Sequence, residues 1–247
     1  MSRSIAVCTQ QRSGTWRGLR ASPYLVELKL DVKIMYSHRY KYPKTPHLSF
    51  SPGIGKDDLK LDRNLLFADC QIVVTEKLDG ENTTLYRDYI HARSLDSRHH
   101  PSRAWVKALQ ASIGHDIPQG WRICGENLYA RHSIAYENLN SYFYIFSIWD
   151  RDNYCLSWAQ TQEWAQMLGL ELPQVIYRGL WDEAKIKAIA NNIDPNICEG
   201  FVVRKVEQFH YNDFAQNIAK WVRSHHVQTD EHWMYREVIP NRLSMDK

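Results

Sequence analysis

Short runs of apolar and β-branched residues recur along the chain, and residues that favour turns separate them. Such runs are typical of strands, and we predict strands over residues 71–75, 82–89, 90–93, 121–124, 142–149, 174–177, 201–206 and 218–222. Apolar residues at helical spacing predict helices over residues 102–113, 157–169 and 182–190. Because strands outnumber helices and do not alternate strictly with them, we expect an α+β fold with largely antiparallel sheets.

Capping residues mark the ends of two of these helices. Ser102 is a predicted N-cap, with Gly114 as the stop. Ser157 opens a segment of capping-box form, and Gly169 closes that helix. Residues 40–58 contain three prolines and two glycines, so we predict an extended arm or loop there.

Composition limits the class of protein. The chain has 247 residues, of which 44% are hydrophobic, so a substantial core is expected and general disorder is not. The five cysteines are an odd number without CxxC spacing, so we expect neither a disulfide framework nor a zinc site, and a reducing compartment such as the cytoplasm fits. The longest apolar run, residues 142–149, is too short to span a bilayer, and no membrane partner is expected. Since the net charge is only +3, any surface that binds nucleic acid must be local.

The N-terminal segment differs from the rest of the chain. Residues 1–26 contain four arginines and no acidic residue, a composition that suits an organelle transit peptide. A disordered tail, or a true translation start at Met35, would explain the same residues. We therefore expect residues 1–34 to be an extension and residues 35–247 to form the folded domain.

The candidate chemistry centres on Lys77, which is predicted to lie in a turn just past the end of a strand. A Lys-x-Asp-Gly turn alone is usually a surface feature. Four charged residues nevertheless lie in or beside predicted strands that otherwise belong to the core, and we expect them to converge with Lys77 on one pocket: Arg93, Glu126, Glu199 and Lys220. A free lysine is neutral in only about one molecule in ~2,500 at pH 7, so a nucleophilic lysine needs nearby positive charge to lower its pKa.

Six segments occur in a fixed order around these residues: 76–82, 91–94, 124–127, 144–148, 199–204 and 219–223. Together they resemble the ordered motifs of the covalent nucleotidyltransferase superfamily of polynucleotide ligases and capping enzymes. The asparagine at position 82, two residues after Asp79-Gly80, resembles the pattern of the RNA ligase branch of this superfamily. The resemblance runs from about Tyr40 to His232 and implies an adenylation domain with antiparallel sheets that flank a nucleotide cleft.

The resemblance implies an ATP-dependent RNA ligase that joins 3′-hydroxyl and 5′-phosphate ends, as in RNA repair. It implies that Lys77 attacks the α-phosphate of ATP and carries AMP, that Lys220 contacts this phosphate, and that Glu199 positions Mg²⁺ or Mn²⁺. The residues implied to bind the nucleotide are Glu76, Asn82, Arg93, Glu126 and Phe146, with Glu126 on the ribose and Phe146 on adenine.

The chain departs from the family pattern at Val222, where a second lysine is usual. Arg223 carries a charge next to it, but in a regular strand it would point to the opposite face. Only 27 residues follow Lys220 (247 − 220), so we expect no appended oligonucleotide-binding barrel. The open alternatives are an ATP-dependent DNA ligase, a capping guanylyltransferase and a non-catalytic module that binds nucleic-acid ends. The substrate also stays open among a nicked duplex, an RNA–DNA hybrid, tRNA and damaged RNA, with or without a partner protein that adds specificity.

Three other features of the sequence are considered as binding sites for a phosphate backbone, a metal or a nucleotide phosphate. The basic and polar stretch of residues 93–103 is a candidate for contact with a phosphate backbone. The histidine pairs at 99–100 and 225–226 are not expected to bind a metal, because adjacent strand residues point apart and no ligand lies at a suitable spacing. The glycines of residues 53–56 do not have the spacing of a phosphate loop.

Overall fold

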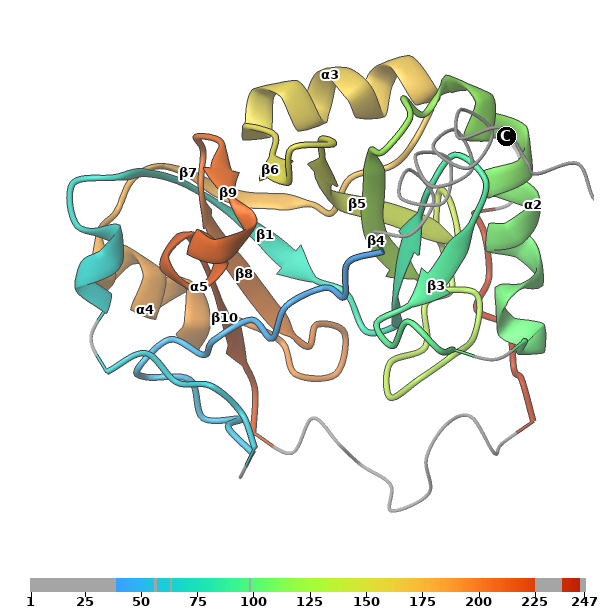
Figure 1. Ribbon diagram of the computed structural model, residues 1–247. Coiled ribbons are helices and arrows are strands. Elements are labelled where there is room, and N and C mark those ends of the chain that lie inside the picture. Colours follow the sequence, from blue (N-terminus) through green and yellow to red (C-terminus); the bar gives the residue numbers. More distant parts are fainter. Residues whose placement is uncertain (1–38, 56, 63, 98, 225–236, 245–247) are drawn as a thin grey trace, which may run out of the picture. The chain divides into compact units, whose positions relative to one another are not determined.

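Two antiparallel sheets organise the part of the chain that the computed structural model describes, which is residues 39–55, 57–62, 64–97, 99–224 and 237–244 (Figure 1). A four-stranded sheet has the order β10 (Ile218–Val222), β8 (Gly200–Lys205), β1 (Gln71–Lys77), β7 (Val175–Leu180). A six-stranded sheet has the order β3 (Ile90–Ala92), β2 (Glu81–Leu85), β4 (Arg122–Asn127), β5 (Phe143–Trp149), β6 (Tyr154–Cys155), β9 (Phe209–His210). Every pairing within these sheets is antiparallel, which confirms the expected α+β fold.

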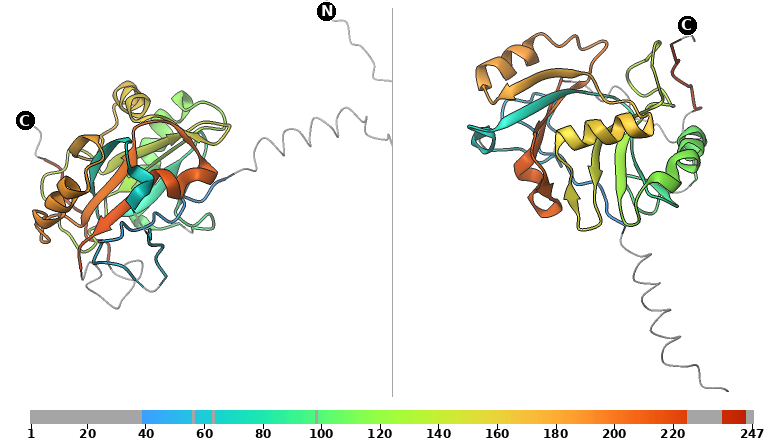
Figure 2. Two further views of the ribbon diagram at one scale, coloured as in Figure 1. Left: turned by 90° about the vertical axis from the view of Figure 1, so that its left-hand side faces the viewer. Right: turned by 90° about the horizontal axis from the view of Figure 1, so that it is seen from above.

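Helices cover the outer face of each sheet, as the views of Figure 2 show. Helix α4 (Glu183–Asn191) and the 3-10 helix η1 (Asn64–Phe67) pack on the four-stranded sheet, where Ile186 and Phe67 share a cluster with Val74. Helices α2 (Ala104–Ile113) and α3 (Trp158–Leu168) pack on the six-stranded sheet in a second cluster. Short helical turns complete the described elements: η2 (Pro101–Arg103), η3 (Gly114–Asp116), η4 (Tyr211–Asp213) and α5 (Phe214–Asn217).

The inner faces of the two sheets face each other. A third cluster joins them, with Cys124 and Trp149 from the six-stranded sheet and Ile218 from the four-stranded sheet. Side chains alternate along a strand, so every second residue of β1, β8 and β10 is directed towards this interior. Charged residues on the inner faces therefore meet between the sheets.

Two predicted helix ends differ from the structure. Ser102 does not cap α2, because Pro101 opens η2 and the His100 side chain accepts from the Ser102 amide. Gly114 does not end the helical segment. Its φ of −57° is helical, and the 3-10 helix η3 follows α2 directly from this residue. The Ser157 capping box and the left-handed Gly169 are both present, as predicted.

Several predicted strands also change length. The strand predicted over 82–89 ends at Leu85, and the one predicted over 174–177 continues to Leu180. Residues 40–58 form the predicted arm, with an isolated bridge at His47. The predicted extension over residues 1–34 and the pair His225-His226 lie outside the described residues. No described helix is long and apolar enough to cross a membrane.

Candidate active site

Lys77 is the last residue of β1 rather than a residue of the following turn. It pairs with Gly200 of β8, and its side chain lies on the inner face with Val73 and Thr75, as strand alternation requires. Its Nζ atom is 2.5 Å from Oε2 of Glu199, the residue directly before β8. The Lys77 side chain is 24% exposed and that of Glu199 is 8% exposed, so this ion pair is largely shielded from solvent.

The protein's own side chains keep Lys77 protonated. Burial alone would lower the pKa of Lys77, but the carboxylates of Glu199, Glu126 and Asp79 outweigh it and raise the pKa above its usual value. A lowered pKa, which a nucleophile requires, is therefore not a property of these side chains alone. Positive charge brought to Glu199 would be needed to free the lysine of its proton.

Glu126 lies across from Asn82 on β2 and from Tyr144 on β5. Burial raises the pKa of Glu126 to about 8, Lys77 opposes this, and the negative charges of Glu199 and Asp79 add to it. Its Oε1 atom accepts from the Gly80 amide at 3.2 Å. At neutral pH, Glu126 is therefore mostly a neutral acid, able both to donate and to accept hydrogen bonds.

Asp79 fixes the turn that leads from Lys77 into β2. Its Oδ2 atom accepts from the Ser133 amide at 2.8 Å, the Ser133 hydroxyl at 2.6 Å and the Ile134 amide at 2.9 Å. The Asp79 amide donates to the Tyr136 hydroxyl at 2.9 Å. The sequence does not predict these contacts with residues 133–136, because that loop has no periodic pattern. The Asp79-Gly80 pair indicated only the turn itself.

Glycine is required at two positions near the Lys77–Glu199 pair, in the turn after Lys77 and directly after Glu199. A Cβ atom on Gly80 would lie 2.5 Å from the carbonyl oxygen of Asn127. Gly200 has a φ of +154°, and a Cβ there would lie 2.0 Å from the carbonyl oxygen of Trp221. The close approach of β8 and β10 therefore depends on the residue that follows Glu199.

Lys220 lies on the inner face of β10, opposite Val202. Burial lowers the pKa of Lys220, Asp58 opposes this, and the cations Lys77 and Arg93 lower the pKa further. Arg93 is exposed just after β3, but its charge reaches Lys220. Lys77, Glu126, Glu199 and Lys220 therefore lie within electrostatic range of one another, whereas Arg93 stays at the exposed edge of this group.

Val222 and Arg223 lie at the end of β10, next to Lys220 and Glu199. Val222 follows Lys220 on the same inner face, and its amide donates to the Ser51 hydroxyl at 3.0 Å. The Arg223 amide donates to the Glu199 carbonyl oxygen at 3.1 Å, so the ladder with β8 continues one residue beyond β10. Because the pairing of β10 with β8 has no register shift, alternation puts Arg223 on the face opposite Lys220.

The other three residues predicted to bind the nucleotide, Asn82, Phe146 and Glu76, lie on three different strands. Asn82 is across from Glu126, and its Oδ1 atom is buried without a hydrogen-bond partner among the described residues. Phe146 lies at a bulge of β5, and its ring centroid is 5.2 Å from that of Tyr42. Glu76 precedes Lys77 in a regular strand, so its side chain lies on the opposite face, and burial raises its pKa. Among the predicted residues that lie within the strands, Glu76 is the one that alternation separates from the inner face.

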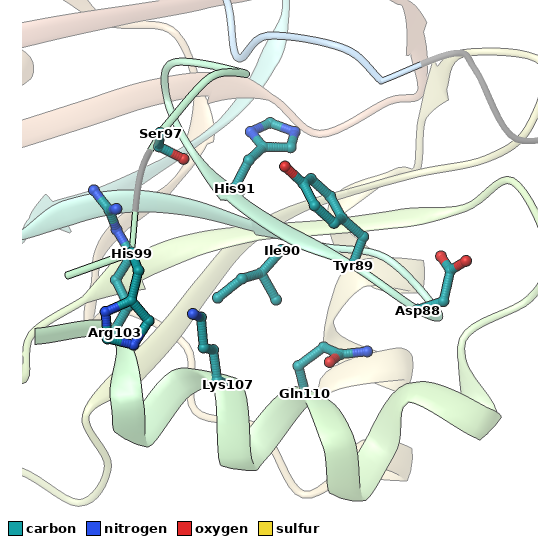
Figure 3. Close-up of a pocket in the computed structure, with 9 residues that line it drawn as sticks. All are labelled: Asp88, Tyr89, Ile90, His91, Ser97, His99, Arg103, Lys107 and Gln110. Atoms are coloured by element: carbon teal, nitrogen blue, oxygen red, sulfur yellow. The ribbon is translucent and has the colours of Figure 1, made fainter. Parts of the chain in front are cut away.

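A cavity of about 370 Å³ lies between the β2–β3 hairpin and α2, away from Lys77 (Figure 3). Its lining residues are Asp88, Tyr89, Ile90, His91, Ser97, His99, Arg103, Lys107 and Gln110. Arg103 is held by the buried carboxylate of Glu81, whereas Lys107 has no ion-pair partner in the described part of the chain. The predicted basic stretch of residues 93–103 thus supplies His99 and Arg103 to the lining of this cavity, which also holds Asp88 and Lys107.

Comparison with protein families identifies the chain. A family model described as RNA ligase matches residues 71–222, from the first residue of β1 to the last residue of β10. The chain belongs to the RNA ligase family. Lys77, Arg93, Glu126, Glu199 and Lys220 all lie within the matched region.

Solved structures of other ligases resemble this RNA ligase family member to different degrees. An archaeal ATP-dependent RNA ligase aligns with a TM-score of 0.50 at 14% identity, over 75% of this chain and 48% of that one. A Naegleria gruberi RNA ligase with PPi has a TM-score of 0.49 at 20% identity, over 75% and 61%. A putative ATP-dependent DNA ligase from Aquifex aeolicus has a TM-score of 0.46 at 18% identity, over 82% and 62%.

The chain thus spans about half to three-fifths of the length of these ligases. At such low identity, the archaeal likeness supports the shared fold alone. Comparison with curated proteins gave no match.

Proposed function

We propose that this RNA ligase family member is an ATP-dependent ligase that carries AMP on Lys77 and joins RNA ends. The observation that carries the proposal is the Lys77–Glu199 ion pair, which lies between the sheets within electrostatic reach of Glu126 and Lys220. A lone surface lysine would have no reason to be held beside one buried and one half-buried carboxyl group and a second lysine.

The inner faces suit a nucleotide. The buried Oδ1 atom of Asn82 is an acceptor that a donor from a base or a ribose would satisfy. Glu126, which holds a proton at neutral pH, can exchange hydrogen bonds with ribose hydroxyls. The half-buried ring of Phe146 can pack on an adenine ring.

Glu199 suits a divalent cation. Within the described ranges, no group of three or more His, Cys, Asp or Glu side chains is placed to hold a metal. Mg²⁺ commonly takes one or two carboxylates and completes its shell with water and substrate phosphates, so Glu199 alone is a sufficient protein ligand. Such an ion would offset the charge of the triphosphate and disfavour the ammonium form of Lys77.

The proposed reaction has three steps. Neutral Lys77 attacks the α-phosphorus of ATP, a nitrogen–phosphorus bond forms, and pyrophosphate leaves while Lys220 contacts the α-phosphate. AMP then passes to a 5′-phosphate end, with Arg93 beside it. Finally a 3′-hydroxyl attacks that end and AMP is released. A Naegleria gruberi RNA ligase variant has been solved with ATP and Mn, the same nucleotide and one of the two metals proposed for this chain.

The RNA strand is proposed to run past the cavity between the β2–β3 hairpin and α2. Lys107 and His99 would contact phosphates there, and the half-buried ring of Tyr89 would stack on a base. The choice among a nicked duplex, an RNA–DNA hybrid and single-stranded ends would be made by this surface or by a partner protein.

The decisive experiment is adenylation of the protein. The full chain is incubated with Mg²⁺ or Mn²⁺ and α-labelled ATP or GTP, and label is sought on the denatured band. We expect label from ATP, its loss in Lys77→Ala, and its retention in Lys205→Ala, a lysine at the other end of the same sheet. Absence of label with every metal would refute the proposal that the chain is an enzyme. Label from GTP alone would indicate a capping activity.

A second assay separates RNA ligase from DNA ligase. Pre-labelled enzyme is offered nicked duplexes with either RNA or DNA at the 3′-hydroxyl side, and sealing is measured. Preference for a DNA 3′-hydroxyl would contradict the proposed substrate. We further propose that deletion of residues 1–34 leaves adenylation intact, and loss of folding in that variant would show that the extension is structural.

A further inference from the structure

The arm before β1 adds to the edge of the four-stranded sheet, beside Lys220 (Figure 1). The Leu48 amide donates to the Lys220 carbonyl oxygen at 2.8 Å, and the Lys220 amide donates to the Pro46 carbonyl oxygen at 2.9 Å. The Gly53 amide donates to the carbonyl oxygen of Val222 at 2.9 Å. Residues 46–53 thus hold the backbone of β10 along the stretch that carries Lys220.

Side chains of the same arm reach the ammonium of Lys220. His47 is fully buried, with Nδ1 at 2.8 Å from the Ser51 hydroxyl and Nε2 at 3.3 Å from Oδ2 of Asp58. The other carboxylate oxygen, Oδ1 of Asp58, is 3.6 Å from Nζ of Lys220. A continuous chain of contacts therefore runs from Ser51 through His47 and Asp58 to Lys220.

The Asp58–Lys220 pair is loose enough to leave the ammonium available. At 3.6 Å the contact is an ion pair longer than an ordinary hydrogen bond, so Lys220 can still direct its N–H donors at a phosphate. Asp58 is fixed independently, because its Oδ2 atom also accepts from the Gly55 amide at 3.0 Å. The carboxylate thus holds a defined position whether or not Lys220 turns towards a ligand.

Asp58 stabilises the charged form of Lys220. Lys220 is largely buried near two other cations, Lys77 and Arg93, and both disfavour its charged form. Asp58 and Glu199 are the negative groups that act in the opposite direction, and Glu199 is already paired with Lys77. The pKa of Asp58 lies below its usual value because the Gly55 amide, Lys220 and His47 outweigh its burial, so Asp58 stays ionised.

We propose that Asp58, held in place by His47, is a positioning residue that keeps Lys220 charged and aimed at the α-phosphate during adenylation of Lys77. The inference rests on the proposed ligase function. Both residues precede the region matched by the family model, which begins at residue 71, so that comparison assigns them no role. The arm would thereby complete a pocket whose second lysine is replaced by Val222.

The test is the single-turnover rate of Lys77 adenylation at saturating ATP, measured for Asp58→Asn against Asp57→Asn. The amide oxygen that Asp58→Asn introduces can still accept from the Gly55 amide, so this variant loses the charge beside Lys220 and keeps the turn. Asp57 is an exposed neighbour whose carboxylate makes no ion pair in the described part of the chain, so it is the matched control. We expect about a 10-fold lower rate for Asp58→Asn and an unchanged rate for Asp57→Asn. Asp58→Glu should recover part of the loss.

A pH profile separates positioning from a general loss of structure. The groups that act on Lys220 are Asp58 from the arm, Lys77 from β1, Glu199 before β8 and Arg93 after β3. Without Asp58, we expect the alkaline limb of the rate profile to move down by about 1 pH unit, because Lys220 loses its proton more easily. A variant that is merely less stable would lose rate at every pH without moving that limb.

His47 provides a second variant. His47→Gln should show a smaller loss in the same direction, and the double variant with Asp58→Asn should be no slower than Asp58→Asn alone, since His47 acts through Asp58. An Asp58→Asn rate and profile equal to those of Asp57→Asn, or additive losses in the double variant, would overturn the inference. If Asp58→Asn unfolds, an unmoved alkaline limb in His47→Gln overturns it instead. Absence of label on the unsubstituted chain would refute the ligase function, and this inference with it.

Discussion

Replacement of Glu126 by glutamine should stabilise the protein at alkaline pH. The carboxyl group has a pKa of about 8 in the folded chain and an ordinary value of 4.5. Below pH 4.5 it is protonated in both folded and unfolded chains and costs nothing. As the pH rises from 4.5 to 8, the unfolded chain releases this proton while the folded chain retains it, so the free energy of unfolding falls.

The size of the effect follows from the two pKa values. A difference of about 3.5 units corresponds to an upper limit of ~5 kcal/mol, of which about 4 kcal/mol develops between pH 5 and pH 9. A chain of this length shifts its Tm by roughly 2–4 °C per kcal/mol. Since Lys77 and Glu199 readjust when Glu126 is replaced, we expect about half of the change between pH 5 and pH 9, which corresponds to ~4–8 °C.

The assay is thermal unfolding of the unsubstituted chain and of Glu126→Gln at pH 5, 7 and 9. The difference in Tm, variant minus unsubstituted chain, should grow with pH, whatever its value at pH 5. Glu163→Gln is the matched control, because Glu163 is exposed on α3 and its variant should follow the unsubstituted chain. A difference that is constant or shrinks with pH would show that Glu126 is an ordinary carboxylate and that the site is described wrongly.

Three further variants test the surroundings of the site. Gly200→Ala should cost about 2–4 kcal/mol in denaturant unfolding, because its Cβ would meet the carbonyl oxygen of Trp221 at 2.0 Å, and an unchanged midpoint would contradict this. Arg103→Met should cost about 3–5 kcal/mol, because it leaves Glu81 buried without its partner, and the double variant with Glu81→Gln should recover part of that loss. Lys107→Ala should weaken RNA binding and lower the salt slope by about 1 while adenylation stays unchanged, and a parallel loss of adenylation would refute a separate RNA contact.

Much of the site could be predicted because its signals are local. Strand patterns located β1, β4, β8 and β10, and charges in or beside these strands indicated a shared pocket. The order of the motifs then indicated the family. The capping box at Ser157 was correct for the same reason, since a helix end is decided by a few neighbouring residues.

The sequence predictions failed where the structure depends on the exact end of a strand or on a contact between residues far apart in the chain. Lys77 was assigned to a turn, whereas β1 includes it, and strand alternation then separates Glu76 from the inner face. Asp58 lies in an arm without periodicity, and its partner Lys220 is far along the chain. No local pattern specifies such a pair, because only the packing of the arm on β10 brings it together.

The path of the chain between the two sheets has a consequence for folding. The four-stranded sheet receives β1, then β7 and β8, and finally β10, while the six-stranded sheet is built from the strands between them. Neither sheet can therefore be completed from one continuous segment, and the pairs that form the pocket are among the most distant in sequence, which favours slow, late assembly. We expect partly folded chains to be unable to accept AMP, so covalent labelling of Lys77 would report, molecule by molecule, on the completion of folding.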